Sequence, residues 1–138
     1  MPIREVPPAE ARRLMSDEGY VYLDVRTMDE FTAGHPEGAW NAPVMEPGRM
    51  GMQPNPDFVR AVAAKFPRNT KLVVGCMAGG RSMRACQILE GEGYETLVNV
   101  RGGFGGARDG MGRVIEKGWQ EAGLPVSTGA LPERLLKP

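Results

Sequence analysis

Short apolar runs alternate with amphipathic segments along most of the chain. In the amphipathic segments, small and apolar residues recur every three or four positions, the spacing of one helix face. Strands are predicted at residues 3–6, 20–24, 39–41, 71–75 and 96–100, and helices at residues 9–15, 28–33, 58–66 and 81–90. Strands and helices alternating at such short intervals predict an α/β fold, a parallel sheet with helices on its faces.

Other segments fall outside this alternation. His35-Pro36 predicts a turn, and residues 43–56, rich in Pro, Gly and Met, predict a long loop. Residues 102–112 contain six glycines in eleven positions, which predicts a segment that is mobile unless something binds it. A last helix is expected over residues 114–122. The chain after Gly129 is expected to be peripheral.

Composition places the chain among ordinary globular proteins. Of its 138 residues, 41% are hydrophobic and 25% charged, which suits a single domain over residues 1–138 with a core at about 3–126. Seventeen basic residues offset seventeen acidic ones, so no global field favours nucleic acid or an anionic membrane. Because no stretch resembles a signal peptide or a membrane span, we expect an intracellular, cytoplasmic protein.

The two cysteines have different surroundings. Cys76 follows an apolar run, whereas Cys86 lies within a predicted helix. A disulfide between them is disfavoured by the separation that loop and helix impose. A metal site is not expected, because there is no CxxC pair and His35 is the one histidine; we interpret it as structural. For Cys86 we expect a place in the core, with a resolving thiol as the alternative.

The segment after Cys76 predicts an activated thiol. It joins a strand to a helix, and Ala78, Gly79 and Gly80 allow the backbone to curl so that its N–H groups face inward. The helix dipole and the charge of Arg81 both favour thiolate over thiol. Cys76 is therefore the candidate nucleophile, and the alternative is a strand-end cysteine that only packs.

With these motifs the sequence resembles the rhodanese family, and most closely its single-domain members such as the plant senescence-associated sulfurtransferases. The likeness covers roughly residues 3 to 126. Its early motifs are Leu23-Asp-Val-Arg26, Glu30-Phe31, Gly34-His35 and Gly38-Ala39-Trp40-Asn41, and its later ones are Cys76-x-x-Gly79-x-Arg81-Ser82, Gly93-Tyr94, Gly102-Gly103 and Gly123-Leu124-Pro125.

The resemblance implies a three-layer fold with a five-stranded parallel sheet, and sulfur transfer without a cofactor. The Cys76 thiolate would take the outer sulfur of thiosulfate or another donor and pass it to cyanide or a thiol. Arg81 would hold the sulfonate, while Arg26 would help at the rim or pair with Asp24 or Glu30. The persulfide would be stabilised by backbone N–H groups between Met77 and Ser82, a loop made of Met77, Ala78, Gly79, Gly80, Arg81 and Ser82.

Two other functions are weighed beside this one. A sulfur-relay module would load sulfur and deliver it to a protein partner, with weak thiosulfate turnover. A phosphatase or arsenate reductase is disfavoured, because four residues separate Cys76 from Arg81 and the related phosphatases have five. Residues 102–112 depart from the family as an insertion, either a lid or docking loop or a plain surface segment. The methionines in the loop, Met45, Met50 and Met52, either form an adaptable binding surface or fill gaps.

Overall fold

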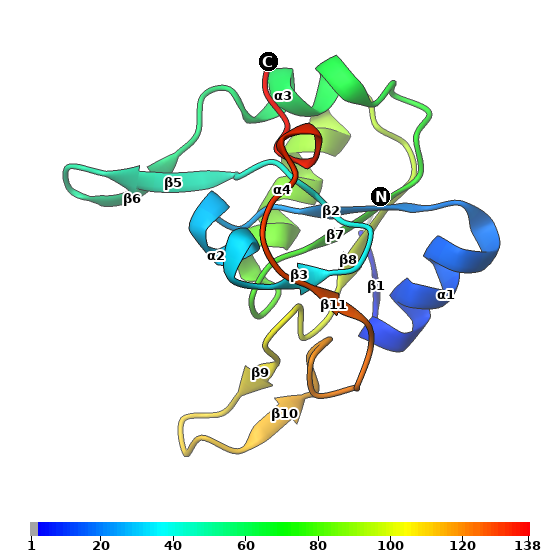
Figure 1. The fold of residues 1–138 in the computed structure, drawn as a ribbon, viewed down its shortest axis with the longest axis vertical. Helices are drawn as coiled ribbons and strands as arrows, with labels where there is room; N and C mark the ends of the chain where they lie inside the picture. The colour runs from blue at the N-terminus through cyan, green and yellow to red at the C-terminus, as the bar shows by residue number, and fades with distance from the viewer. Residues whose placement is uncertain (1–2) are drawn as a thin grey trace.

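A five-stranded parallel sheet runs through the centre of the computed structural model, which describes residues 3–138 (Figure 1). Each neighbouring pair of strands is parallel, as short crossover connections through helices require. The predicted sheet is confirmed. Its strands, in spatial order, are β1 (Arg4–Val6), β8 (Leu97–Val100), β7 (Leu72–Gly75), β2 (Val21–Asp24) and β4 (Trp40–Asn41).

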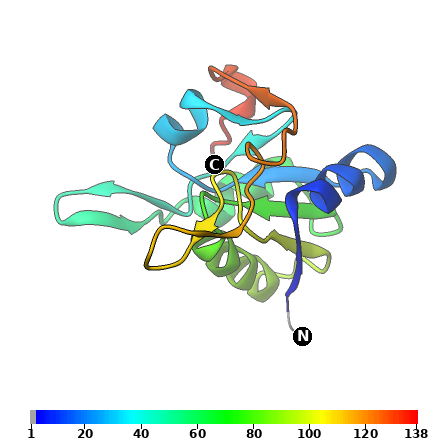
Figure 2. The ribbon, with the colours of Figure 1, turned by 90° about the horizontal axis from the view of Figure 1, so that it is seen from below.

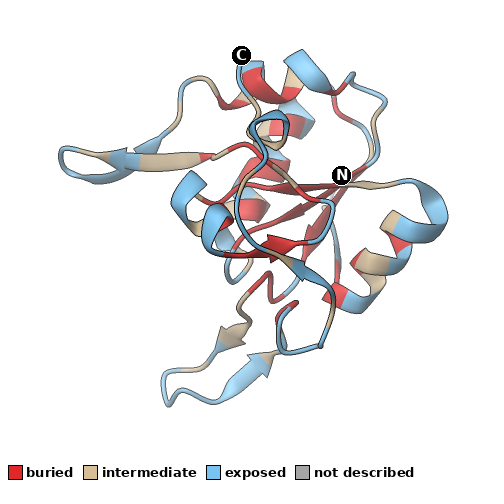
Figure 3. Ribbon diagram, in the orientation of Figure 1, coloured by how far each residue is buried: buried red, intermediate tan, exposed pale blue. Residues whose placement is uncertain are grey.

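Helices cover both faces of the sheet, which confirms the three layers. They are α1 (Pro8–Glu18), α2 (Met28–Ala33), α3 (Phe58–Lys65) and α4 (Gly80–Gly91). Leu23 and Val74 share one buried cluster with side chains of α3 and α4. Tyr22 and Val73 share a second cluster with side chains of α1 and α2. Adjacent strand residues alternate between faces, so α2 and α4 lie on opposite sides of the sheet (Figure 2) and the buried residues form its centre (Figure 3).

The predicted long loop at residues 43–56 is instead largely a β-hairpin that projects from the body (Figure 1). Its strands are β5 (Met45–Gly48) and β6 (Gly51–Pro54), paired antiparallel. Gly51 has φ of +103°, which allows the tight turn between them. The sequence did not indicate these strands, because Pro47 and Pro54 predict an interrupted β-ladder. In the structure, both prolines lie in a two-stranded hairpin, where each strand has an edge that tolerates proline.

The predicted last helix at residues 114–122 is wrong. Val114–Glu116 is strand β10, which pairs antiparallel with β9 (Ala107–Arg108), and turns follow it. The apolar spacing arises because Trp119 is buried against Tyr22, with ring centroids 5.5 Å apart. The backbone at Gly118 packs so closely on Gly106 that a side chain there would collide with it. The apolar residue that the sequence analysis placed on a helix face, Trp119, is instead buried from a turn.

The end of the chain is less peripheral than predicted. Strand β11 (Val126–Ser127) pairs antiparallel with β3 (His35–Pro36), so His35-Pro36 is a short strand and the turn follows it. Beyond the 3₁₀ turn η1 (Pro132–Arg134), the Leu136 amide donates a hydrogen bond of 2.9 Å to the Asn41 carbonyl. The tail therefore covers the β4 edge of the sheet. Within residues 3–138, none of the helices combines the length and apolar character needed to cross a membrane.

We expect Trp119→Ala to destabilise the fold by about 3–5 kcal/mol, because it empties a fully buried site and removes the indole hydrogen bond to the Pro125 carbonyl. Met111→Ala is the control, since that side chain is 82% exposed on the neighbouring hairpin. Urea denaturation of both variants measures the difference. A loss below about 1 kcal/mol for Trp119→Ala would contradict the packing described.

Candidate active site

Cys76 is the first residue after β7, at the carboxyl end of the sheet. The residue is buried, with 2% of its surface exposed. The Gly79 amide donates a hydrogen bond of 3.1 Å to the sulfur. The Ser82 hydroxyl, in the first turn of α4, lies 3.3 Å from the same sulfur. Gly79 has φ of +122°, a conformation that favours glycine. The loop therefore presents the Gly79 amide and the Ser82 hydroxyl to the sulfur, whereas the sequence predicted several backbone N–H groups between Met77 and Ser82 facing inward.

The start of the glycine-rich segment supports this loop from outside. The amides of Phe104 and Gly105 donate hydrogen bonds of 2.8 and 2.9 Å to the carbonyls of Cys76 and Met77. Gly103, with φ of +53°, lies so close that a Cβ there would collide with the Cys76 carbonyl. Residues 102–105 are thus part of the site's framework. The sequence interpretation of residues 102–112 as a lid, a docking loop or a plain surface segment missed this contribution.

A polar chain extends from the sulfur through the predicted loop residue Ser82 to Asn99 and Glu5, two residues that sequence reasoning missed, at the edge of the sheet. The Ser82 hydroxyl contacts the side-chain oxygen of Asn99, and the Asn99 amide donates a 3.0 Å hydrogen bond to the Glu5 carboxylate. Ser82 and Asn99 are almost completely buried. Asn99 is the one polar residue in the apolar strand β8, and that exception was the available signal.

Arg81, the predicted sulfonate ligand, is paired with a carboxylate of α2. Its guanidinium donates two hydrogen bonds to Glu30, of 2.7 and 3.0 Å. Glu30 also closes a capping box with Thr27 at the start of α2. The Arg81 hydrogen bond is the main cause that lowers the pKa of Glu30 to about 2, and Glu30 in turn raises the pKa of Arg81. The pair therefore joins α2 to α4 beside the Cys76 loop.

Arg26, whose predicted role was either a rim helper or an ion-pair partner, is in this structure the partner of Asp24. It is 1% exposed, and its guanidinium donates to the Asp24 carboxylate at 2.7 Å and to the Gly34 carbonyl at 2.7 Å. Phe104 lies under the guanidinium, 4.4 Å from it to the ring centroid. This geometry favours a structural role, in which Arg26 fixes α2 and the segment around Phe104.

The remaining predicted loop residues form the rim of the site. Met77, Ala78 and Gly80 are exposed, whereas Ser82 is buried. Cys86 packs in the core between the sheet and α4, and burial raises the pKa of its thiol to about 12. It is therefore protonated at neutral pH. Among residues 3–138, no group of three or more His, Cys, Asp and Glu side chains is placed to hold a metal ion.

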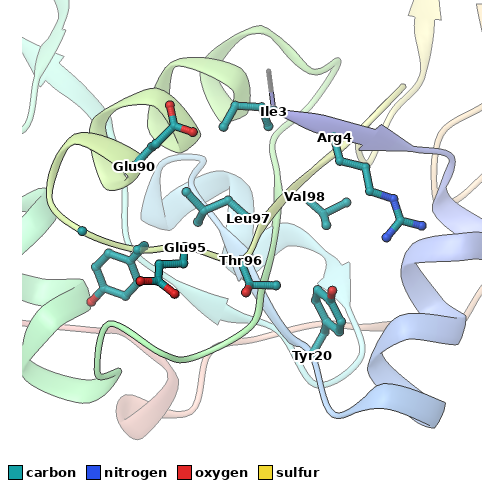
Figure 4. A pocket seen from close by; sticks show the side chains of 10 residues that line it. Ile3, Arg4, Tyr20, Glu90, Glu95, Thr96, Leu97 and Val98 are labelled. Carbon is teal, nitrogen blue, oxygen red and sulfur yellow. The ribbon is translucent and has the colours of Figure 1, made fainter. Parts of the chain in front are cut away.

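The cavities lie at both ends of the sheet. One cavity, of about 600 Å³, is at the amino ends of β1 and β8, where Arg4, Tyr20 and Leu97 line it (Figure 4). Cys76 follows the carboxyl end of β7, so this cavity lies at the opposite end of the strands and is not the site of chemistry at Cys76. Glu30 lines two other cavities. One, of about 550 Å³, is also lined by Arg81, and the other, of about 250 Å³, is also lined by Met77.

Comparison with known proteins agrees with this architecture. The model of the rhodanese-like domain matches residues 7–108, well over half of the chain. The chain belongs to the rhodanese family. Among rhodanese relatives, thiosulfate sulfurtransferase 16, chloroplastic, from Arabidopsis thaliana is 42% identical over 108 residues, which are 78% of this chain and 80% of that protein. Senescence-associated protein DIN1 from Raphanus sativus is 38% identical over 97 residues, 70% of this chain and 53% of that protein.

A solved structure shares the fold of this chain. The crystal structure of Rv0390 from M. tuberculosis superposes with a TM-score of 0.76 at 25% identity, covering 94% of this chain and 100% of that one. The family resemblance and the fold predicted from the sequence motifs are thereby confirmed. The roles of individual site residues stay predictions. The contacts around Cys76 and Arg81 identify the groups that these predictions concern.

We expect Glu30→Gln to lower the free energy of unfolding at neutral pH, with a difference from wild type that shrinks as the pH falls from about 4.5 towards 2. The ordinary pKa of this carboxyl is 4.5 and its folded value is about 2, so its ionic stabilisation is complete above the first value and is lost on passing the second. Urea midpoints across this range measure the effect. Asp29→Asn, an exposed neighbour on α2, is the control. A difference that does not change with pH would contradict the ion pair.

Proposed function

We propose that this rhodanese-family protein is a sulfurtransferase that carries sulfane sulfur on Cys76. The observation that carries the proposal is the sulfur of Cys76, which lies at a strand's carboxyl end with the Gly79 amide 3.1 Å away. The relative named thiosulfate sulfurtransferase 16 supports the same activity. In the proposed reaction, thiosulfate or a similar compound is the sulfur donor, and cyanide or a thiol is the acceptor.

The first half-reaction requires no proton from the protein. The Cys76 thiolate attacks the outer sulfur of thiosulfate, a new S–S bond forms, and the S–S bond of the donor breaks. The electron pair of the broken bond leaves with sulfite, which is a stable anion. The Gly79 amide and the Ser82 hydroxyl already lie against the Cys76 sulfur, so they can stabilise the attacking thiolate without rearrangement.

The second half-reaction returns the thiolate. A cyanide ion or an acceptor thiolate attacks the terminal sulfur of the persulfide, and the electron pair of the Cys76 S–S bond returns to the Cys76 sulfur. The product is thiocyanate or a new persulfide. Because the two substrates react in turn with one nucleophile, the protein alternates between a free and a sulfur-loaded form.

Ser82 has a specific part in this exchange. Its single proton is shared between the Asn99 side-chain oxygen and the Gly79 carbonyl while Cys76 is a thiol. When Cys76 is a thiolate or a persulfide anion, that proton can turn to the sulfur. The buried contact with Asn99 holds the hydroxyl in place for the change. Ser82 is therefore assigned as a donor to the charged sulfur.

The ion pair between Arg81 and Glu30 bears on the two alternative functions, a phosphatase or arsenate reductase and a sulfur relay. An arginine after the cysteine loop would bind the oxygens of a phosphoryl group in a phosphatase, and those of a sulfonate in a sulfurtransferase. Here the Arg81 guanidinium is held by Glu30 through two hydrogen bonds. The pairing bears equally on a sulfonate and on a phosphoryl group, so the preference for sulfur chemistry rests on the four residues between Cys76 and Arg81. A sulfur relay to a protein partner uses the same first half-reaction and differs in its acceptor.

Steady-state thiocyanate formation from thiosulfate and cyanide tests the activity. We expect parallel double-reciprocal lines for wild type, no activity for Cys76→Ser, and nearly full activity for Cys86→Ala, because Cys86 is a core residue with a protonated thiol. Retained turnover in Cys76→Ser would overturn the proposal. Loss of turnover in a folded Cys86→Ala variant would instead give Cys86 a part in the reaction.

A further inference from the structure

Glu5 and Asn99 form a pair that the reaction described above does not use. They are direct partners in the parallel register of strands β1 and β8, at the edge of the sheet (Figure 1). The Asn99 amide donates a hydrogen bond of 3.0 Å to the Glu5 carboxylate. Glu5 is exposed, whereas Asn99 is almost completely buried. The pair therefore connects the surface of the protein to the buried surroundings of Cys76.

The hydrogen-bond partners of Asn99 fix which way its amide points. A carboxylate accepts hydrogen bonds and donates none, so the NH₂ group of Asn99 must face Glu5. The Gly79 carbonyl, 3.4 Å from the same nitrogen, is a second acceptor for that group. The side-chain oxygen of Asn99 is left facing the Ser82 hydroxyl, and this oxygen can only accept.

The Ser82 hydroxyl has one proton and three acceptors within reach. The Asn99 oxygen is the nearest of them, followed by the Gly79 carbonyl at 3.1 Å and the Cys76 sulfur at 3.3 Å. The Gly79 carbonyl also accepts a hydrogen bond of 3.2 Å from the Met83 amide, so it is already occupied. The Asn99 oxygen is therefore the main competitor of the sulfur for this proton. A carboxylate bound to the NH₂ group polarises the amide and strengthens that competitor.

We propose that Glu5 and Asn99 are positioning residues that hold the Ser82 proton away from the Cys76 sulfur. This inference rests on the proposed sulfurtransferase function and concerns the balance between its two half-reactions. A thiolate that accepts fewer hydrogen bonds is more basic. A more basic thiolate attacks a sulfur donor faster but is a slower leaving group. Glu5 and Asn99 thus favour the loading of sulfur over its release.

Other ionisable groups near the sulfur keep one charge state while a cysteine titrates. The hydrogen bond to Glu30 is the main cause that raises the pKa of Arg81, and the charge of Cys76 adds to it. Burial raises the pKa of Tyr22 well above its ordinary value and that of Cys86 to about 12, and the Cys76 charge adds to both. Arg81 therefore stays charged, and Tyr22 and Cys86 stay neutral, at neutral pH.

The pH dependence of Cys76 alkylation measures where the Ser82 proton is. Iodoacetamide reacts with the thiolate, and peptide mapping separates Cys76 from Cys86. In Glu5→Ala the Asn99 amide is free to turn, and its NH₂ group can then donate to Ser82, which releases the hydroxyl proton to the sulfur. We expect the midpoint of the alkylation profile to fall by about one pH unit.

Three further variants separate this effect from the loss of a charge. Glu90→Ala is the matched control, because Glu90 is exposed and its charge, like that of Glu5, adds to the burial that raises the pKa of Cys86. It should leave the midpoint unchanged, since Glu5 is the carboxylate that receives the Asn99 amide. Asn99→Leu removes the competing acceptor and should lower the midpoint. In a Ser82→Ala background, Glu5→Ala should no longer shift it, because the hydroxyl through which it acts is gone.

The two half-reactions are then measured separately. Rapid quench and intact mass give the rate at which thiosulfate loads Cys76, at a pH above the alkylation midpoint, and the rate at which cyanide removes the sulfur. For a shift of about one pH unit, a Brønsted slope of about 0.5 predicts loading that is about threefold slower in Glu5→Ala and release that is about threefold faster. The ratio of loading to release should therefore fall about tenfold.

The outcomes separate this inference from the function on which it rests. If wild type gains no sulfur on Cys76, the sulfurtransferase function fails, while the alkylation midpoints still test the placement of the Ser82 proton. If sulfur loads but Glu5→Ala leaves the midpoint and the rate ratio unchanged, the positioning role is wrong. An equal shift in Glu90→Ala, or an undiminished shift in the Ser82→Ala background, would reduce the effect to charge and overturn the role of Asn99.

Discussion

Two backbone hydrogen bonds from the neighbouring segment hold the shape of the Cys76 loop. The amides of Phe104 and Gly105 donate to the carbonyls of Cys76 and Met77, at 2.8 and 2.9 Å. Such an approach is possible because Gly103, which precedes them, has no side chain to collide with the loop. The loop held in this way directs the Gly79 amide and the Ser82 hydroxyl to the Cys76 sulfur. The nucleophile's surroundings are therefore set by backbone packing from outside the loop.

The same contact connects the site to the core. The Trp119 amide donates a hydrogen bond of 2.8 Å to the Gly103 carbonyl, and the Trp119 indole packs on Tyr22 from β2. Phe104 lies on the guanidinium of Arg26, which pairs with Asp24 at the end of that strand. Glu30 then links α2 to Arg81 on α4. Large buried side chains thus position a small loop, as preorganised binding of a charged sulfur requires.

Much of the fold follows from local patterns, and the exceptions have physical causes. The central strands β2, β7 and β8 were predictable because they are buried on both faces and read as largely apolar runs, such as 71–75. The Cys76 loop was predictable because its glycines, its cysteine and its arginine are adjacent in sequence. The hairpin at residues 45–54 was not, because its prolines conceal an exposed antiparallel pair. The turns around Trp119 were mistaken for a helix, since burial of single residues can imitate a helical period.

The site was less predictable than the fold because its contacts join distant parts of the chain. Arg81 is 51 residues from Glu30, and Asn99 is 94 residues from Glu5. Charge pairing across such separations has no local signature, so the sequence indicated a free Arg81 and an Arg26 of open role.

Sulfur loading on Cys76 is the central claim, and mass spectrometry after treatment with thiosulfate tests it most directly. Intact mass counts the added sulfur, and peptide mapping after alkylation locates it. We predict a gain of one sulfur atom on the peptide that contains Cys76 in wild type, and no gain in Cys76→Ser. An unmodified wild-type chain, or added sulfur on Cys86 in place of Cys76, would contradict the account.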